Sequence, residues 1–124
     1  MLYEGDLKRL INRKIVNVEQ SQDGVNFFIE FEDGKEKFYV DADCCSESWI
    51  EHLEVPNDIN GATLLSVHEA DMIDGGSDIA GNRGEQECLS VYETRFCTNK
   101  GDIVLEYRNS SNGYYGGSLV LCKK

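Results

Sequence analysis

The stretch VNFFIEFE at residues 25–32 decides the fold, because apolar and polar side chains alternate along it. Alternate side chains of an extended strand point to opposite faces, so the four apolar residues share one face. These residues are Val25, Phe27, Ile29 and Phe31. Asp-Gly pairs at 23–24 and 33–34 flank the stretch and favour tight hairpin turns. The pattern predicts an antiparallel β-meander.

Further strands are expected on both sides of this stretch. Residues 14–19 and 36–40 complete the meander, and Asp6 is expected to cap a short helix before it. The second half of the chain shows similar strand patterns separated by Asn- and Gly-containing turns. The strands expected there are 62–69, 87–97, 103–108 and 118–122.

Two segments break the strand pattern. Residues 44–53 lack a period of two, and Ser46 is a suitable N-cap, so a second short helix ending before Pro56 is expected. Residues 71–84 are rich in glycine and acidic residues and predict a long loop, either functional or a tolerated surface insertion. The expected fold is a single α+β domain over residues 1–124, a twisted antiparallel β-sheet of about six or seven strands with one or two short helices.

The composition restricts the partners that this protein can bind. The chain carries 12 basic and 23 acidic residues, a formal net charge of −11 at pH 7. Such a surface repels long nucleic acids, although a local group of cations can still bind a small anion, because salt screens the wider field over roughly 8 to 10 Å. Without a bilayer-length apolar run or a signal-peptide pattern, a soluble cytoplasmic protein with no membrane partner is expected. The five cysteines are expected to stay reduced.

Catalytic and metal-binding patterns are weak. The two histidines, His52 and His68, lie in no known catalytic motif, and the adjacent Cys44 and Cys45 do not have the spacing of a zinc site. We therefore expect no metal, no cofactor and no enzymatic activity. A phosphodiesterase-like or thiol enzyme that uses Cys45 and His52 ranks last among the alternatives.

The segment at residues 107–117 is the best candidate for a ligand site, because it combines an arginine with amides, hydroxyls, aromatics and glycines and contains no acidic residue. Arginine suits phosphate, tyrosine suits base stacking, and asparagine and serine suit base or ribose edges. A Gly-rich hairpin turn explains the same pattern without a ligand. Trp49 is a second candidate for stacking, or else a core residue, and Arg95 is a second candidate for phosphate. The candidates in 107–117 are Arg108, Asn109, Ser111, Asn112, Tyr114 and Tyr115.

Several of these motifs resemble those of a family of small proteins from tailed phages. The family pattern includes an F-x-x-D-G hairpin, a D-C-C-S or D-C-C-E element and a final hairpin with S-N-G-Y-Y. The chain departs from it at Gly116-Gly117, where many relatives have Ser-Glu, at Tyr107-Arg108, where Arg-Trp is usual, and in lacking a histidine before the cysteine pair. The matching segments are 10–15, 31–34, 43–46, 92–96, 100–108 and 111–115.

The resemblance implies a role in immune evasion. Some small phage proteins of this type are homo-oligomeric sponges, which bind a cyclic nucleotide defence signal in the host cytoplasm without hydrolysing it. An anti-CBASS sponge for a cyclic dinucleotide such as cGAMP is favoured; a cyclic trinucleotide or a cyclic ADP-ribose isomer is the other possible ligand. In this hypothesis Arg108 and Arg95 face phosphates, Tyr114, Tyr115 and Trp49 stack on bases, and Asn109, Ser111 and Asn112 read their edges.

An acidic inhibitor or DNA mimic that binds a host protein is the alternative function. In that case the charge of −11 is itself the active feature. The acidic residues around the expected loop would carry it. They are Asp71, Asp74, Asp78, Glu85 and Glu87.

Overall fold

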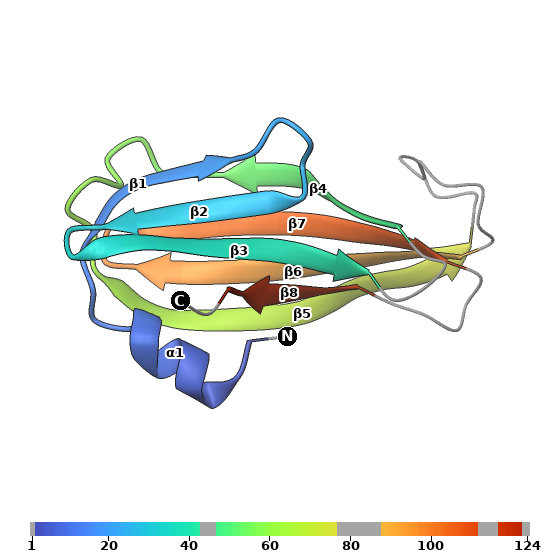
Figure 1. Ribbon diagram of the computed structural model, residues 1–124, viewed down its shortest axis with the longest axis horizontal. Helices are drawn as coiled ribbons and strands as arrows, with labels where there is room; N and C mark the ends of the chain where they lie inside the picture. The colour runs from blue at the N-terminus through green and yellow to red at the C-terminus, as the bar shows by residue number, and fades with distance from the viewer. Residues whose placement is uncertain (1, 43–46, 77–87, 112–116, 123–124) are drawn as a thin grey trace.

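The computed structural model describes residues 2–42, 47–76, 88–111 and 117–122. Within these residues the chain forms one short helix and eight strands (Figure 1). The elements are α1 (Glu4–Leu10), β1 (Ile15–Gln20), β2 (Asn26–Phe31), β3 (Gly34–Ala42), β4 (Glu47–Glu54), β5 (Leu64–Gly76), β6 (Cys88–Thr98), β7 (Gly101–Ser111) and β8 (Gly117–Leu121).

The strands form two antiparallel sheets of four strands each, whereas the sequence pattern predicted one sheet. The first sheet has the order β1-β2-β3-β8 and the second has the order β4-β7-β6-β5. The last strand, β8, therefore returns to pair with β3 in the first sheet. The expected meander of β1, β2 and β3 is confirmed.

The core lies between the two sheets. Phe27 and Phe38 of the first sheet contact Phe96 of the second, with ring centroids 5.6 and 5.7 Å from that of Phe96. Tilted and edge-on contacts of this kind suit the quadrupoles of aromatic rings. Ile29 and Phe31 are also buried, so the face predicted for β2 is the core face. The fold is a small two-layer sandwich with a helix on one side.

The helix begins earlier than the sequence analysis expected. Tyr3 is the N-cap residue, and Asp6 lies at the third helical position instead of capping the helix. From there the Asp6 carboxylate accepts a hydrogen bond from the Tyr3 amide at 3.0 Å. A carboxylate at this position reaches back to the N-cap amide, which explains why an acidic residue still stabilises this helix start.

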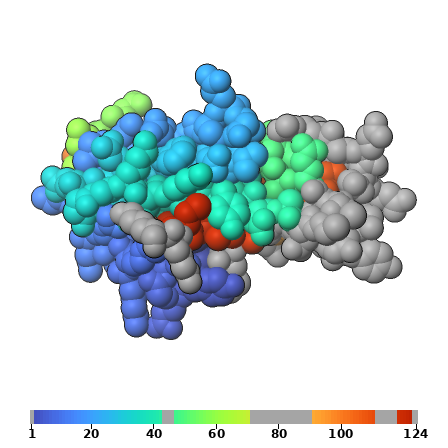
Figure 2. All heavy atoms as spheres, in the orientation of Figure 1, coloured from blue at the N-terminus to red at the C-terminus, as the bar shows by residue number. Residues whose placement is uncertain are grey.

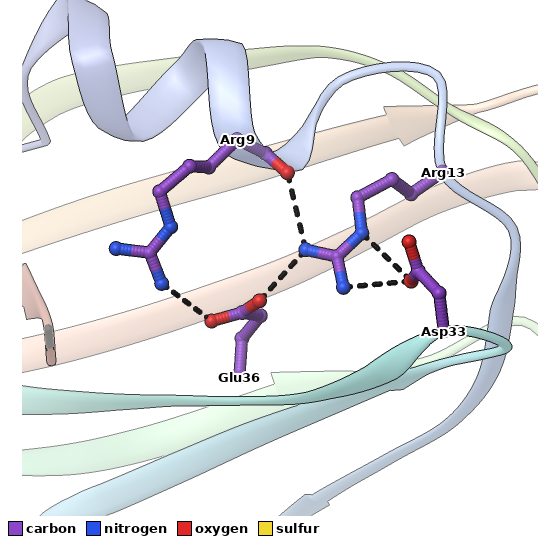
Figure 3. A network of polar contacts seen from close by, with 4 residues as sticks. All are labelled: Arg9, Arg13, Asp33 and Glu36. Atoms are coloured by element: carbon purple, nitrogen blue, oxygen red, sulfur yellow. Dashed lines mark hydrogen bonds and ion pairs between the residues drawn. The ribbon is translucent and has the colours of Figure 1, made fainter. Parts of the chain in front are cut away.

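An ion-pair network attaches the helix to the first sheet (Figure 3). Glu36 of β3, whose side chain is 4% exposed, accepts hydrogen bonds of 2.7 Å from both Arg9 and Arg13. Arg13 also pairs with Asp33 at 2.7 Å and lies over the Phe31 ring. Figure 2 shows α1 projecting from one side of the molecule beside the first sheet. The buried carboxylate is therefore fully engaged by two cations.

The second expected helix is wrong. Residues 47–54 form β4, an edge strand that pairs with β7, whereas Cys44, Cys45 and Ser46 lie outside the described residues. Ile50 packs in the core between the sheets, while Trp49 lies on the opposite face. Burial on both faces removes the polar alternation that marks a strand, so the local sequence pattern was misleading.

The expected loop at residues 71–84 is wrong in its first part. Residues 71–76 extend β5 and pair with β6, up to Gly76 opposite Cys88. Backbone hydrogen bonds of the ladder form regardless of the side chains, so a glycine- and acid-rich stretch can still be a strand. Residues 77–87 lie outside the described part of the chain. Among the described helices, none is long and apolar enough to cross a membrane.

Candidate functional site

Arg108 lies on the outer face of the second sheet, away from the core. Its neighbour Tyr107 is buried between the sheets, and side chains alternate along a strand. The cross-strand partners of Arg108 are Trp49 of β4 and Val91 of β6, so the three residues form a row on one face. Trp49 and Val91 are 1% and 3% exposed and form an apolar cluster separate from the main core. The structure therefore brings together two of the predicted site residues, Trp49 and Arg108.

Two carboxylates neutralise Arg108. Its guanidinium lies 3.4 Å from Oε1 of Glu51 and 3.1 Å from Oε2 of Glu106. The Arg108 side chain is 17% exposed and that of Glu51 is 33% exposed. An anionic ligand at Arg108 must therefore compete with carboxylates already in place.

Arg95 lies on the same face but further along the strands. It is opposite Val104, four residues from Arg108 on β7, which corresponds to roughly 13 Å. Arg95 contacts Asp102 at 3.2 Å and Glu93 at 3.4 Å. The hydrogen bond to Asp102 and the nearby charge of Glu93 raise the pKa of Arg95 above its usual value.

These side chains define what we call the arginine face. Two arginines and four carboxylates give it a formal charge of 2 − 4 = −2. Each arginine is paired with two of the carboxylates. The face is therefore charge-paired, and the buried Trp49 lies opposite Arg108 in the ladder. Its residues are Trp49, Glu51, Val91, Glu93, Arg95, Asp102, Glu106 and Arg108.

Asn109 is separated from Arg108 by the sheet. It is buried and donates a hydrogen bond of 2.9 Å from its side-chain amide to Ser48 Oγ. Ser48 in turn donates to the carbonyl oxygen of Asp41 at 2.8 Å, which connects β4 to β3. The predicted edge-reading residue thus belongs to a polar network inside the sandwich.

Of the other site residues predicted in the segment 107–117, the structure describes only Ser111. Ser111 is the last residue of β7 and is paired with Cys88. Asn112, Tyr114 and Tyr115 lie outside the described residues.

Two residues near Arg108 were not predicted. Ser110, two positions along the same face of β7, is buried, and its hydroxyl has no hydrogen-bond partner among the described residues. Strand alternation from Arg108 was a signal that could have found it. Glu51 had no such signal, because a register shift between Ile50 and His52 places it.

Both histidines, His52 and His68, are exposed on the protein surface. His52 is exposed, with Nε2 3.2 Å from Oε1 of Glu54, and its proposed partner Cys45 lies outside the described residues. His68 lies 3.2 Å from Ser66 Oγ on the surface of β5. A hydroxyl activated for attack needs an oriented base in a shielded site, and solvent-exposed pairs do not provide one. Among the described residues, no group of three or more His, Cys, Asp or Glu side chains is arranged to hold a metal ion.

Comparisons with known proteins identify a family. No curated protein and no solved structure matches the chain. The profile of a domain of unknown function, DUF7448, matches residues 8–121, which span all eight described strands. The chain therefore belongs to the DUF7448 family.

Proposed function

We propose that this protein binds a cyclic nucleotide defence signal, with a cyclic dinucleotide such as cGAMP as the favoured ligand, and sequesters it without hydrolysis. In this proposal it is a phage protein of immune evasion that acts in the host cytoplasm. The ligand occupies the arginine face beside Arg108. The resemblance to tailed-phage proteins suggested the class of ligand, and the placement of Trp49 next to Arg108 supports the site.

The pair of Trp49 and Arg108 is the observation that carries the proposal. A guanidinium binds a phosphate through two parallel hydrogen bonds, whereas the Trp49 indole, 1% exposed, must be uncovered before a base can stack on it. Cross-strand neighbours on one face of a sheet lie about 4.5 to 5.5 Å apart at Cβ, close enough to contact one nucleotide together. Sequestration requires tight binding and no catalytic base.

Self-association is part of the proposal. The edge strands of the two sheets are β1 and β8, and β4 and β5. A sheet edge presents backbone donors and acceptors to which a strand of a second copy can bind. Light scattering coupled to size-exclusion chromatography should give a mass that is a multiple of the 14.0 kDa chain. A monomer at micromolar concentration would remove this part of the proposal.

A ligand screen tests the proposal directly. Thermal shift and calorimetry should be run with cGAMP, a cyclic trinucleotide and a cyclic ADP-ribose isomer, because a ligand that binds only the folded state raises the melting temperature. The bound ligand should then be released by heat and analysed by chromatography. We expect intact nucleotide, and a hydrolysed product would point to an enzyme.

Matched variants locate the site. Arg108→Ala should weaken cGAMP binding at least tenfold, because it removes a charged hydrogen-bond donor. Lys35→Ala removes the same charge from an exposed ion pair with Glu19 in the first sheet and should leave binding unchanged. Equal affinity of the native protein and Arg108→Ala would exclude the arginine face.

The excess of carboxylates on the arginine face favours a second candidate, the acidic inhibitor that binds a basic host protein. Asp71 and Asp74 belong to β5, whereas Asp78, Glu85 and Glu87 lie outside the described residues. Binding to a polylysine probe that is lost at high salt, together with no response to any nucleotide, would favour this candidate.

A further inference from the structure

Glu51 owes its position to an irregularity in β4. The register with β7 shifts between Ile50 and His52, so Glu51 is the extra residue of a β-bulge. A bulge redirects side chains and is found frequently at the edges of sheets and next to functional sites. Here the Glu51 carboxylate reaches the Arg108 guanidinium at 3.4 Å.

A contact from the first sheet holds the strand just before this bulge. The amide of Ile50 donates a hydrogen bond of 2.6 Å to the carbonyl oxygen of Gly24, in the turn between β1 and β2. Strand β4 therefore supplies two groups to Arg108, the Trp49 indole as its cross-strand partner and the Glu51 carboxylate from the bulge.

Of the two carboxylates at Arg108, Glu51 is the more accessible. Its side chain is 33% exposed and lies on an edge strand, whereas that of Glu106 is 23% exposed and lies on β7 itself, two residues from Arg108. The Glu51 contact is also the longer of the two, 3.4 Å against 3.1 Å for Glu106, so its Coulombic attraction to Arg108 is the weaker. Glu51 is thus the partner that a ligand can most readily replace.

We infer that Glu51 is a counter-ion that the ligand displaces: it occupies the phosphate position at Arg108 in the free protein and leaves when an anionic ligand binds. This inference rests on the proposed function, because it concerns the same site. Glu51 thereby lowers affinity for every anion, and only a ligand that also gains contacts elsewhere overcomes the competition. The residue therefore sets the binding free energy that any anion must supply to occupy Arg108.

The test is a charge-neutral substitution. Glu51→Gln keeps the side-chain shape and removes the competing charge, so the affinity for cGAMP should rise about three- to fivefold. The gain for inorganic phosphate should be of the same size, because competition at Arg108 is independent of the base. Glu19→Gln is the control, since it removes a carboxylate from the Lys35 ion pair on the first sheet. That control should bind like the native protein.

The outcomes separate this inference from the proposed function. If the native protein binds cGAMP through Arg108 and Glu51→Gln binds with the same affinity, the counter-ion inference is wrong and the proposed function stands. If neither the native protein nor Glu51→Gln binds any of the nucleotides, both are overturned. A double variant of Glu51→Gln and Arg108→Ala should show no gain over Arg108→Ala alone; a persistent gain would show that Glu51 acts by general repulsion and would also refute the inference.

Discussion

The carbonyl oxygen of Gly24 accepts a hydrogen bond from the amide of Ile50 at 2.6 Å, and this contact connects the first hairpin turn to the edge strand of the second sheet. Gly24 has a positive φ of 72°, which a residue with a side chain adopts only at a cost. The turn and the strand before the bulge at Glu51 are thus held together at a position that favours glycine.

Gly24→Ala is predicted to destabilise the protein by about 1 to 2 kcal/mol, because the left-handed conformation is strained for alanine. A Cβ at this position would lie 3.6 Å from the Ile50 carbonyl oxygen, an ordinary contact, so the cost is conformational. Gly5→Ala is the control: Gly5 lies within α1 with no heavy atom near its Cβ position, and the substitution should stabilise by roughly 0.5 to 1 kcal/mol. Urea unfolding measures both, and equal effects would contradict the prediction.

Removal of the hydroxyl from Ser110 or Thr94 is predicted to leave stability unchanged or to increase it. Both side chains are buried, and among the described residues neither hydroxyl has a hydrogen-bond partner. A buried polar group without a partner costs about 1 to 3 kcal/mol, so Ser110→Ala and Thr94→Val relieve that cost. Ser48→Ala, which breaks the links to Asn109 and Asp41, should instead destabilise by a similar amount. The melting temperatures of Ser110→Ala and Thr94→Val should equal or exceed that of the native protein, and that of Ser48→Ala should be lower.

Glu36→Gln is predicted to destabilise the protein by about 2 to 3 kcal/mol. The Glu36 carboxylate is buried and accepts charged hydrogen bonds from Arg9 and Arg13. When Glu36 is replaced by the neutral glutamine, neither arginine regains an equally charged partner in its place. Glu4→Gln in the exposed pair with Lys8 is the control and should change stability by less than about 0.5 kcal/mol. A small effect at Glu36 would show that water replaces the lost contacts.

Asp23 is predicted to make the protein more sensitive to acid. The Ser21 hydroxyl and the Val25 amide donate hydrogen bonds to its carboxylate and lower its pKa below the usual value. Ionised Asp23 therefore stabilises the folded state above its unfolded pKa, and this contribution is lost as the pH falls through its folded pKa. Ser21→Ala should raise the pKa of Asp23 in an NMR titration. An unchanged pKa would show that the Val25 amide alone accounts for the shift.

The sequence predicted those parts of the fold that local alternation specifies. The core face of β2 follows directly from a period of two. Strand β4 could not be recognised, because Trp49 and Ile50 are buried on opposite faces and their apolar character is therefore continuous.

The candidate site was predictable only in its components. Arginine and tryptophan are suitable residue types, but the row that joins Trp49 to Arg108 depends on the register between β4 and β7. The approach of Glu51 depends on a bulge, which inserts one residue without a reliable signature in this sequence. Asn109 was assigned to the ligand because the sequence does not show that Ser48 lies opposite it.

The pairing of β3 with β8 sets an order of events during synthesis. The first sheet combines three strands that are consecutive in sequence, β1 to β3, with the distant β8, and Phe38 lies opposite Leu121. Closing so long a loop is entropically costly and slows folding. During synthesis the edge of β3 that pairs with β8 therefore stays uncovered until residues 117–121 have emerged from the ribosome.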